Sequence, residues 1–150
     1  MPLPNDIKVR IRSLSKPDYT ISISHIKYSN CARDHNQMKI ILNKSERTND
    51  DEFIHIFDLK KGLSSFESVK YPGYFLDKMY GNDKPDKRFI LYKNNKTPAQ
   101  RFKITTLNNI STIESCCVNA GYISYNLENY TILCDTVSGE NTQFFFEICI

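Results

Sequence analysis

With 150 residues, the chain is long enough to bury on the order of 70% of its unfolded surface in one core, without disulfides or metals as staples. Its 20 basic and 17 acidic side chains are interspersed and give a net charge of +3, whereas dedicated nucleic-acid binding usually requires a clustered basic stripe. The five cysteines are odd in number and include an adjacent pair, which disfavours a disulfide framework and fits a reducing compartment.

The N-terminal residues 1–6 contain no apolar stretch of the kind found in signal peptides. No run anywhere in the chain approaches the roughly 18 apolar residues that a membrane-spanning helix needs. We therefore expect neither a signal peptide nor a membrane span, and a protein that is cytoplasmic or secreted without a leader. A chain from which a signal peptide had been removed would look the same.

Residues 19–62 form the first of three predicted units. Ile23-Ser24-His25 marks a faint first strand, and the pair Ile41-Leu42 marks an inner strand. Phe53 follows Leu42 by 11 residues. Short apolar runs separated by turn residues at this spacing are typical of all-β proteins.

Residues 63–109 repeat the same markers more clearly. Phe66-Glu67-Ser68 is a strand, and Pro72-Gly73 predicts a tight turn, because Pro presets a negative φ and Gly tolerates a positive one. Ile90-Leu91 then precedes Phe102 by the same 11 residues, counted from the Leu. The polar residues 81–87 predict a lengthened hairpin loop.

Residues 110–150 carry the third copy. Ile113-Glu114-Ser115 repeats the strand, Gly121-Tyr122 repeats the turn, and Ile132-Leu133 again precedes a Phe by 11 residues. Two markers in constant phase across three units fix an architecture more firmly than local propensity does.

Three units of about 45 residues with four short strands each predict one β-trefoil domain over residues 1–150, with about twelve strands in a capped six-stranded barrel. A β-sandwich shows no such threefold phase, and a propeller needs more blades. Glu67 and Glu114 follow inward residues and should face outward. The predicted core consists of Ile23, Leu42, Phe53, Phe66, Leu91, Phe102, Ile113, Leu133 and Phe144.

The chain lacks the common signatures of catalysis, such as a Gly-rich phosphate loop, His-Glu-x-x-His or Gly-x-Ser-x-Gly. The histidines His25, His35 and His55 share no register that predicts a metal site. We expect no enzymatic activity and no cofactor. Of the three, His35 lies in a polar turn, where loops often carry function.

Residues 65–76, Ser-Phe-Glu-Ser-Val-Lys-Tyr-Pro-Gly-Tyr-Phe-Leu, resemble the corresponding stretch of the arabinose-binding trefoil module of fungal arabinofuranosidase B enzymes. The stretch is also similar to the Phe-Glu-Ser…Pro-Gly-x-Phe-Leu signature of the interleukin-1 family. In those cytokines the signature belongs to the last unit, whereas here a complete further unit follows. The resemblance to the arabinose-binding module covers roughly residues 20–150.

In that module, each sugar pocket uses a His at the end of the second strand and an Asp shortly before the Phe that closes the unit. His35 lies seven residues before Leu42, and Asp50 lies three residues before Phe53, so the first unit resembles the module at both positions. The resemblance therefore implies ligand binding by His35 and Asp50.

The other two units depart from that pattern. The corresponding residues are Lys78 and Ala99 in the second unit, and Tyr125 and Asn141 in the third. Pairing with vicinal sugar hydroxyls requires a carboxylate or amide acceptor and a suitable partner. We therefore expect no pocket in the second unit and a possible second pocket at Tyr125 and Asn141.

The resulting hypothesis is a non-enzymatic, lectin-like module that binds a glycan or glycoprotein, with no nucleic-acid partner. The alternative is a trefoil that binds a protein, either as a leaderless cytokine-like ligand or as a cytosolic scaffold resembling the actin-binding trefoils. A protease-inhibitor trefoil is disfavoured by the missing signal peptide and disulfides.

Overall fold

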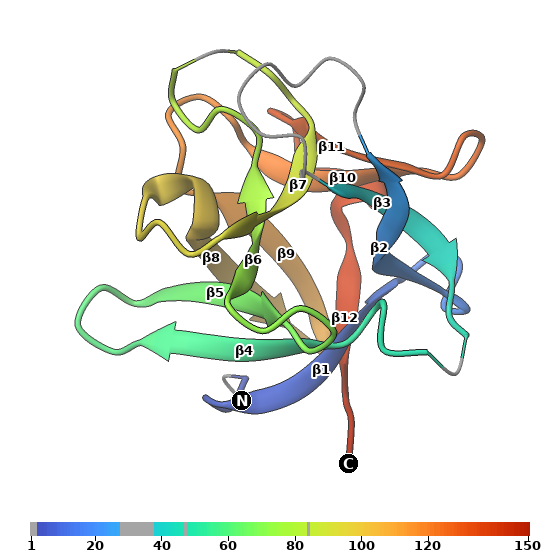
Figure 1. Ribbon diagram of the computed structural model, residues 1–150. Coiled ribbons are helices and arrows are strands. Elements are labelled where there is room, and N and C mark those ends of the chain that lie inside the picture. Colours follow the sequence, from blue (N-terminus) through green and yellow to red (C-terminus); the bar gives the residue numbers. More distant parts are fainter. Residues whose placement is uncertain (1–2, 28–37, 47, 84) are drawn as a thin grey trace.

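Strands and tight turns make up nearly all of the described chain. The computed structural model describes residues 3–27, 38–46, 48–83 and 85–150 (Figure 1). Within these ranges, the predicted all-β trefoil of about twelve strands is confirmed. The strands are β1 (Ile7–Ser13), β2 (Tyr19–Lys27), β3 (Met38–Lys44), β4 (Phe53–Asp58), β5 (Leu63–Ser68), β6 (Tyr74–Lys78), β7 (Phe89–Lys93), β8 (Phe102–Leu107), β9 (Ile110–Ser115), β10 (Tyr122–Asn126), β11 (Thr131–Asp135) and β12 (Phe144–Ile148), with 3₁₀ helices η1 (Pro98–Gln100) and η2 (Glu140–Thr142).

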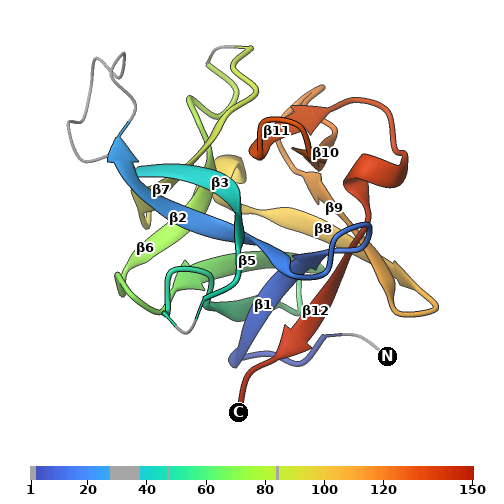
Figure 2. The same cartoon turned by 90° about the vertical axis from the view of Figure 1, so that its right-hand side faces the viewer.

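Six of the strands close on themselves in a ring of antiparallel pairs. β1 pairs with β12, β12 with β9, β9 with β8, β8 with β5, β5 with β4, and β4 returns to β1. This closure satisfies the backbone groups that open sheet edges would expose. The remaining strands form the hairpins β2–β3, β6–β7 and β10–β11, which lie at one end of the barrel (Figures 1 and 2).

The first strand of each unit has the same pattern of burial. In β1, β5 and β9, three alternating residues are buried and the last of them is a serine. In all three units, the serine hydroxyl takes part in a hydrogen bond with the turn that follows. The buried sets are Val9, Ile11 and Ser13; Ser64, Phe66 and Ser68; and Ser111, Ile113 and Ser115.

This register corrects the prediction for the first unit. Ile11, not Ile23, corresponds to Phe66 and Ile113, and β1 lies before residue 19, where we placed the start of that unit. The predicted copy failed because Ile23 belongs to the second strand, β2, where it is also buried.

The predicted core is largely confirmed. Ile23, Leu42, Phe53, Phe66, Leu91, Phe102, Ile113 and Phe144 are each at most 2% exposed. The prediction for Leu133 is wrong, because this side chain is 37% exposed. In the β10–β11 hairpin, Cys134 opposes Ile123 as Leu91 opposes Leu76 in β6–β7, so the core position in the third unit falls one residue later than the Ile-Leu marker.

The predicted turn at Pro72-Gly73 is also present. Gly73 has a φ of +88°, which glycine adopts without steric cost. Its backbone N–H donates to Glu67 Oε2 at 2.7 Å, so this recurring glutamate supports the turn.

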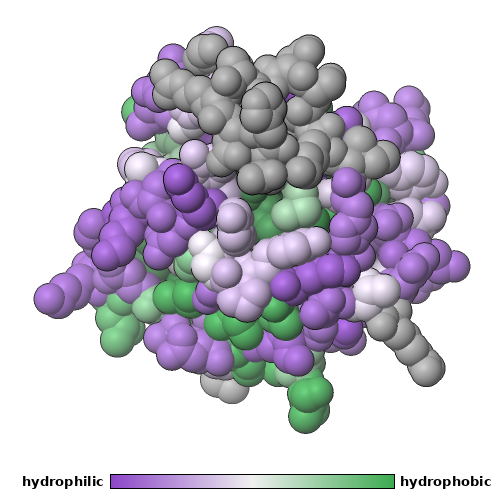
Figure 3. Space-filling view, in the orientation of Figure 1, coloured by the Kyte–Doolittle hydropathy of each residue, from purple (hydrophilic) through white to green (hydrophobic). Residues whose placement is uncertain are grey.

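Among the coloured residues in Figure 3, polar ones cover most of the surface, and hydrophobic ones form separate patches between them, mainly in the lower half. None of the helices in the described residues has the length and apolarity needed to cross a membrane.

Candidate functional site

The residues predicted for the first unit are only partly described. His35 lies within residues 28–37, outside the described residues. Asp50 lies beside two basic side chains: Lys70 Nζ is 2.9 Å from its Oδ1, and His25 Nε2 is 3.2 Å from its Oδ2. Hydrogen bonds with Lys70 and His25 outweigh burial and lower the pKa of Asp50. The carboxylate is therefore already engaged by its neighbours.

The two residues predicted in the third unit have different surroundings. Tyr125 is 1% exposed and packs edge-on against Phe144, with ring centroids 5.2 Å apart. Its hydroxyl donates to the backbone oxygen of Glu140 at 3.0 Å and lies within hydrogen-bond distance of Ser15 Oγ, at 3.1 Å. Asn141 is exposed in η2. The Tyr125 ring is thus part of the core, and its hydroxyl is already hydrogen-bonded within the protein.

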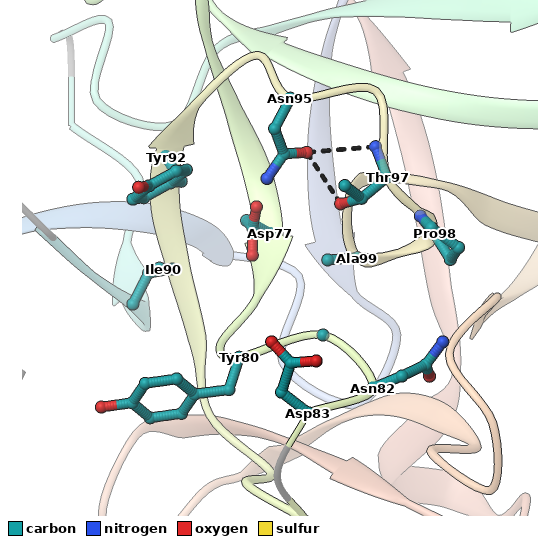
Figure 4. Close-up of a pocket in the computed structure, with 11 residues that line it drawn as sticks. Asp77, Tyr80, Asn82, Asp83, Ile90, Tyr92, Asn95, Thr97, Pro98 and Ala99 are labelled. Carbon is teal, nitrogen blue, oxygen red and sulfur yellow. Dashed lines mark hydrogen bonds between the residues drawn. The ribbon is translucent and has the colours of Figure 1, made fainter. Parts of the chain in front are cut away.

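A cavity of about 330 Å³ opens in the second unit (Figure 4). Its walls are the end of β6 with the loop that follows it, strand β7, and residues 95–99 at the start of η1. We call it the unit-two cavity. Sequence reasoning expected no pocket in this unit, because the resemblance required a His and an Asp that Lys78 and Ala99 replace.

Asp77 lies at the inner end of this cavity. It is on β6 between Leu76, which faces the core, and Lys78, and its own side chain is only 4% exposed. The buried amide of Gln100 donates from Nε2 to Asp77 Oδ2 at 2.9 Å and to the backbone oxygen of Lys93 at 2.8 Å. None of the described residues donates a hydrogen bond to the other oxygen, Asp77 Oδ1.

Burial raises the pKa of Asp77 to about 7, and only part of this effect is offset by the Gln100 hydrogen bond and by the charge of Lys78. The carboxyl group is therefore half-protonated near neutral pH and can act as either an acceptor or a donor of hydrogen bonds.

One wall of the cavity is apolar and aromatic. Ile90 opposes Asp77 across the β6–β7 pair, and the half-buried ring of Tyr92 lies beside it (Figure 4). Ala99 forms the opposite wall, at the position that Asp50 and Asn141 occupy in the other units. The short Ala side chain leaves room that a longer residue would fill.

A comparison of the three units shows why the pairing of Asp77 with Gln100 occurs only in the second. The residue nine positions after the strand-ending serine is Asp77 in the second unit but Ser22 and Ser124 in the others. The residue two positions before the closing Phe is Gln100, compared with Asp51 and Thr142. Only the second unit combines a carboxylate with an amide partner at these positions.

Sequence reasoning missed Asp77 and Gln100. A signal was present: a carboxylate directly beside a core leucine in a strand is costly to bury without a partner. The partner of this carboxylate is Gln100, 23 residues further along the chain. Only an alignment of the three units on β1, β5 and β9 could have related the two positions.

The cavity combines a few polar groups with an aromatic wall. Within the described ranges, no group of three or more His, Cys, Asp or Glu side chains is placed to hold a metal ion. A cavity with a few convergent polar groups and one aromatic wall suits a small molecule that is rich in hydroxyls.

The closed barrel with three hairpins defines the protein as a β-trefoil. No protein-family model matches the chain, and no curated protein matches it in sequence.

Solved structures resemble it over nearly its whole length. A mosquitocidal holotoxin has a TM-score of 0.83 and 12% identity, covering 99% of this chain and 18% of the toxin. The lectin of Polyporus squamosus, solved with a sialylated epitope, has a TM-score of 0.76 and 13% identity, covering 98% of this chain and 50% of the lectin. The BEL β-trefoil has a TM-score of 0.75 and 13% identity, covering 99% and 97%. At these identities the likeness shows the fold alone.

Proposed function

We propose that the protein is a non-enzymatic carbohydrate-binding module and that the unit-two cavity is its sugar site. The observation that carries this proposal is Asp77, which lines a cavity with an aromatic wall: one of its oxygens accepts a hydrogen bond from Gln100, while no described residue donates to the other. The trefoil lectin of Polyporus squamosus, whose structure contains the epitope Neu5Acα2-6Galβ1-4GlcNAc, supports the same class of ligand.

The proposed binding mode follows from the chemistry of the cavity. A sugar hydroxyl donates to Asp77 Oδ1, where the charge of the carboxylate strengthens the bond. A less polar face of the sugar ring packs against Tyr92, as amphipathic ligands do on aromatic walls. Gln100 holds the carboxylate in place before the ligand arrives, which limits the ordering cost of binding.

The sites implied by resemblance to the arabinose-binding module stay secondary predictions. At His35 and Asp50, a ligand would compete with Lys70 and His25 for the carboxylate. At Tyr125 and Asn141, it would compete with the hydrogen bonds that the Tyr125 hydroxyl already makes.

The test is a glycan array followed by calorimetric titration of the sugars that bind. Because a hydrogen bond to a charged group contributes about 1.5–3 kcal/mol, Asp77→Asn should weaken binding by about tenfold or more. Tyr92→Ala should weaken it through loss of the aromatic wall. Glu128→Gln, which removes a charge from an exposed hairpin position, is the matched control and should bind as the unmodified protein does.

The pH dependence provides a second readout. Since the charged carboxylate is the better acceptor, affinity should fall as the pH drops below about 7, and Asp77→Asn should abolish this dependence. Unchanged sugar binding in both Asp77→Asn and Tyr92→Ala would refute the site. If no sugar on the array binds, the protein-binding alternative becomes the better hypothesis.

A further inference from the structure

A second cavity of about 290 Å³ adjoins the unit-two cavity. It lies between the ends of the β4–β5 hairpin, strand β6 and the loop that leads into η1. We call it the side cavity. Thr97 lines both cavities, so a ligand that extends from one to the other would pass this residue. The inference below rests on the proposed sugar site and concerns the class of its ligand.

The loop between the two cavities has a fixed conformation. Asn95 Oδ1 accepts a hydrogen bond from Thr97 Oγ1 at 2.7 Å, and Asn94 Oδ1 accepts one from the backbone N–H of Lys96 at 3.2 Å. Lys96 itself has a φ of +55°, which directs the chain around this turn. Asn95 and Ala99 therefore line the unit-two cavity, whereas Lys96 lines the side cavity.

The two cavities differ in charge. Asp77 and Asp83 line the unit-two cavity, and no described basic side chain does so. Lys96 and Arg101 line the side cavity, where the only acidic side chain among the described residues is Asp58.

Neither Asp58 nor Arg101 forms an ion pair with another residue that lines the side cavity. Asp58 Oδ1 accepts hydrogen bonds from the backbone N–H groups of Lys60 and Lys61, at 3.0 and 3.2 Å, and so caps its own hairpin turn. Arg101 is a half-buried residue, and its guanidinium makes no hydrogen bond or ion pair with any described residue. A partly buried guanidinium is usually paired, because its five donors lose water on burial.

Apolar side chains form part of the side-cavity wall, beside the polar side chains of Ser64, Ser65 and Asn94. Phe75 is 7% exposed, and Ile56, Phe57 and Leu63 contribute further hydrocarbon. A charge pair formed against such a wall is screened less by solvent than one on an open surface. An anion that reached Arg101 would therefore bind more strongly there than at a surface lysine.

We propose that the side cavity is an acidic-sugar subsite, and that the ligand is an oligosaccharide with an uncharged sugar in the unit-two cavity and an anionic group paired with Arg101 and Lys96. The planar guanidinium suits bidentate recognition of a carboxylate or a sulfate ester. Thr97 marks the point where the two sugars join.

The experiment compares oligosaccharide pairs that differ at one sugar. One arm pairs a uronic-acid-containing oligosaccharide with its carboxyl-reduced counterpart, and the other pairs a sulfated oligosaccharide with its unsulfated counterpart. Titration calorimetry should give tighter binding of the acidic member by about tenfold at low salt, since hydrogen bonds to charged groups are worth at least that much. The arm with the larger ratio identifies the anion.

Substitutions assign the preference to the side cavity. Arg101→Gln and Arg101→Ala should reduce the ratio to near one while leaving the affinity for the uncharged member unchanged. Lys103→Ala removes an exposed positive charge two residues away that does not line the cavity, and should keep the ratio. Asp77→Asn should weaken both members of a pair and also leave the ratio intact. Thermal unfolding of each variant checks that it is folded.

The outcomes separate the two proposals. Binding of uncharged sugars that depends on Asp77, with no preference for the acidic member or with a preference that survives both Arg101 variants, would overturn the acidic subsite and leave the sugar site standing. Absence of binding by every member of both arms would overturn both.

Discussion

Asp77 is the side chain on which the proposed site depends, and its burial has a thermodynamic consequence. The fold keeps this carboxyl group 4% exposed and raises its pKa from 3.8 to about 7. A buried carboxylate without a full set of donors is unfavourable, so the site is maintained at the expense of stability. Functional groups of binding sites commonly show such raised pKa values.

The sign of the effect can be tested by unfolding. Because the folded state holds a proton that the unfolded state releases at about pH 3.8, Asp77 lowers stability progressively as the pH rises to about 7. The shift corresponds to at most about 4 kcal/mol. Asp77→Asn should therefore be neutral near pH 4 and stabilising at pH 8 in urea denaturation. Equal stability differences at both pH values would contradict this assignment.

Leu133 and Leu91 offer a second test at the scale of the residue. Leu91 is fully buried, so Leu91→Ala should destabilise the protein by about 2–5 kcal/mol through the lost burial and the cavity left behind. Leu133 is 37% exposed, and Leu133→Ala should cost less than about 1 kcal/mol. Guanidinium denaturation of both variants measures the difference, and similar losses would show that the third hairpin has the register of the second.

The turns between the first and second strands of the second and third units differ in their tolerance of a side chain. Gly73 and Gly121 both have positive φ, +88° and +81°. A Cβ at Gly73 would meet open space, whereas one at Gly121 would clash with the backbone of Asp135 and Thr136 on the neighbouring β11 hairpin. Gly73 provides only the positive φ that its turn requires, whereas Gly121 also allows two backbone segments to approach closely.

We therefore expect Gly73→Ala to cost about 1–2 kcal/mol from backbone strain alone. Gly121→Ala should cost distinctly more, because the backbone of the β10–β11 hairpin must also move. Thermal melts of the two variants compare them directly. Equal decreases in melting temperature would mean that the β10–β11 hairpin moves to accommodate the new Cβ without a further loss of stability.

The loop before η1 shows how one element can serve two cavities. Residues 94–101 contribute to both cavities, and the side chains of Asn94 and Asn95 accept hydrogen bonds within the turn between them. Loops on a rigid barrel commonly carry the residues that vary with the ligand.

At the scale of the whole molecule, the barrel is closed where the beginning and the end of the chain meet. β1 pairs with β12 over five residue pairs and with β4 on its other side. The segment before β1 is held by His55, whose Nδ1 donates to the Pro4 oxygen at 2.7 Å while its Nε2 accepts from Ser64 Oγ at 2.7 Å. These two bonds define the neutral tautomer of the imidazole.

Burial outweighs the bond to Pro4 and the charge of Asp6, and lowers the pKa of His55 below 6.5. As the pH drops, the unfolded chain therefore takes up a proton before the folded one does, so the contribution of His55 to stability should fall below about pH 6.5, opposite in sign to that of Asp77. His55→Gln should reduce this slope, which is at most about 1.4 kcal/mol per pH unit. Urea denaturation between about pH 5 and 8, the range in which histidine titrates, measures it. An unchanged slope in His55→Gln would assign the effect to other groups.

Several features could be derived from the sequence by itself. Burial alternates along each strand and repeats from unit to unit, so the phase of Phe66, Ile113 and the closing phenylalanines predicts both the trefoil and most of its core. This information is local and periodic. The core prediction failed at Leu133, because an apolar pattern alone does not distinguish one position from its neighbour. The repeat assignment failed at Ile23, which is buried but belongs to β2, because the strand β1 was missed.

Only the tertiary structure shows the cavity that we propose as a ligand site. Asp77, Tyr92 and Gln100 come from β6, β7 and η1, and their proximity depends on strand pairing and on the course of one loop. The short side chain of Ala99 leaves the cavity open. The resemblance to the arabinose-binding module had instead led us to expect no sugar pocket in this unit, because Ala99 stands where that module has an Asp. A core is specified by patterns that recur along the chain, whereas a site depends on single residues whose meaning is set by what the fold places beside them.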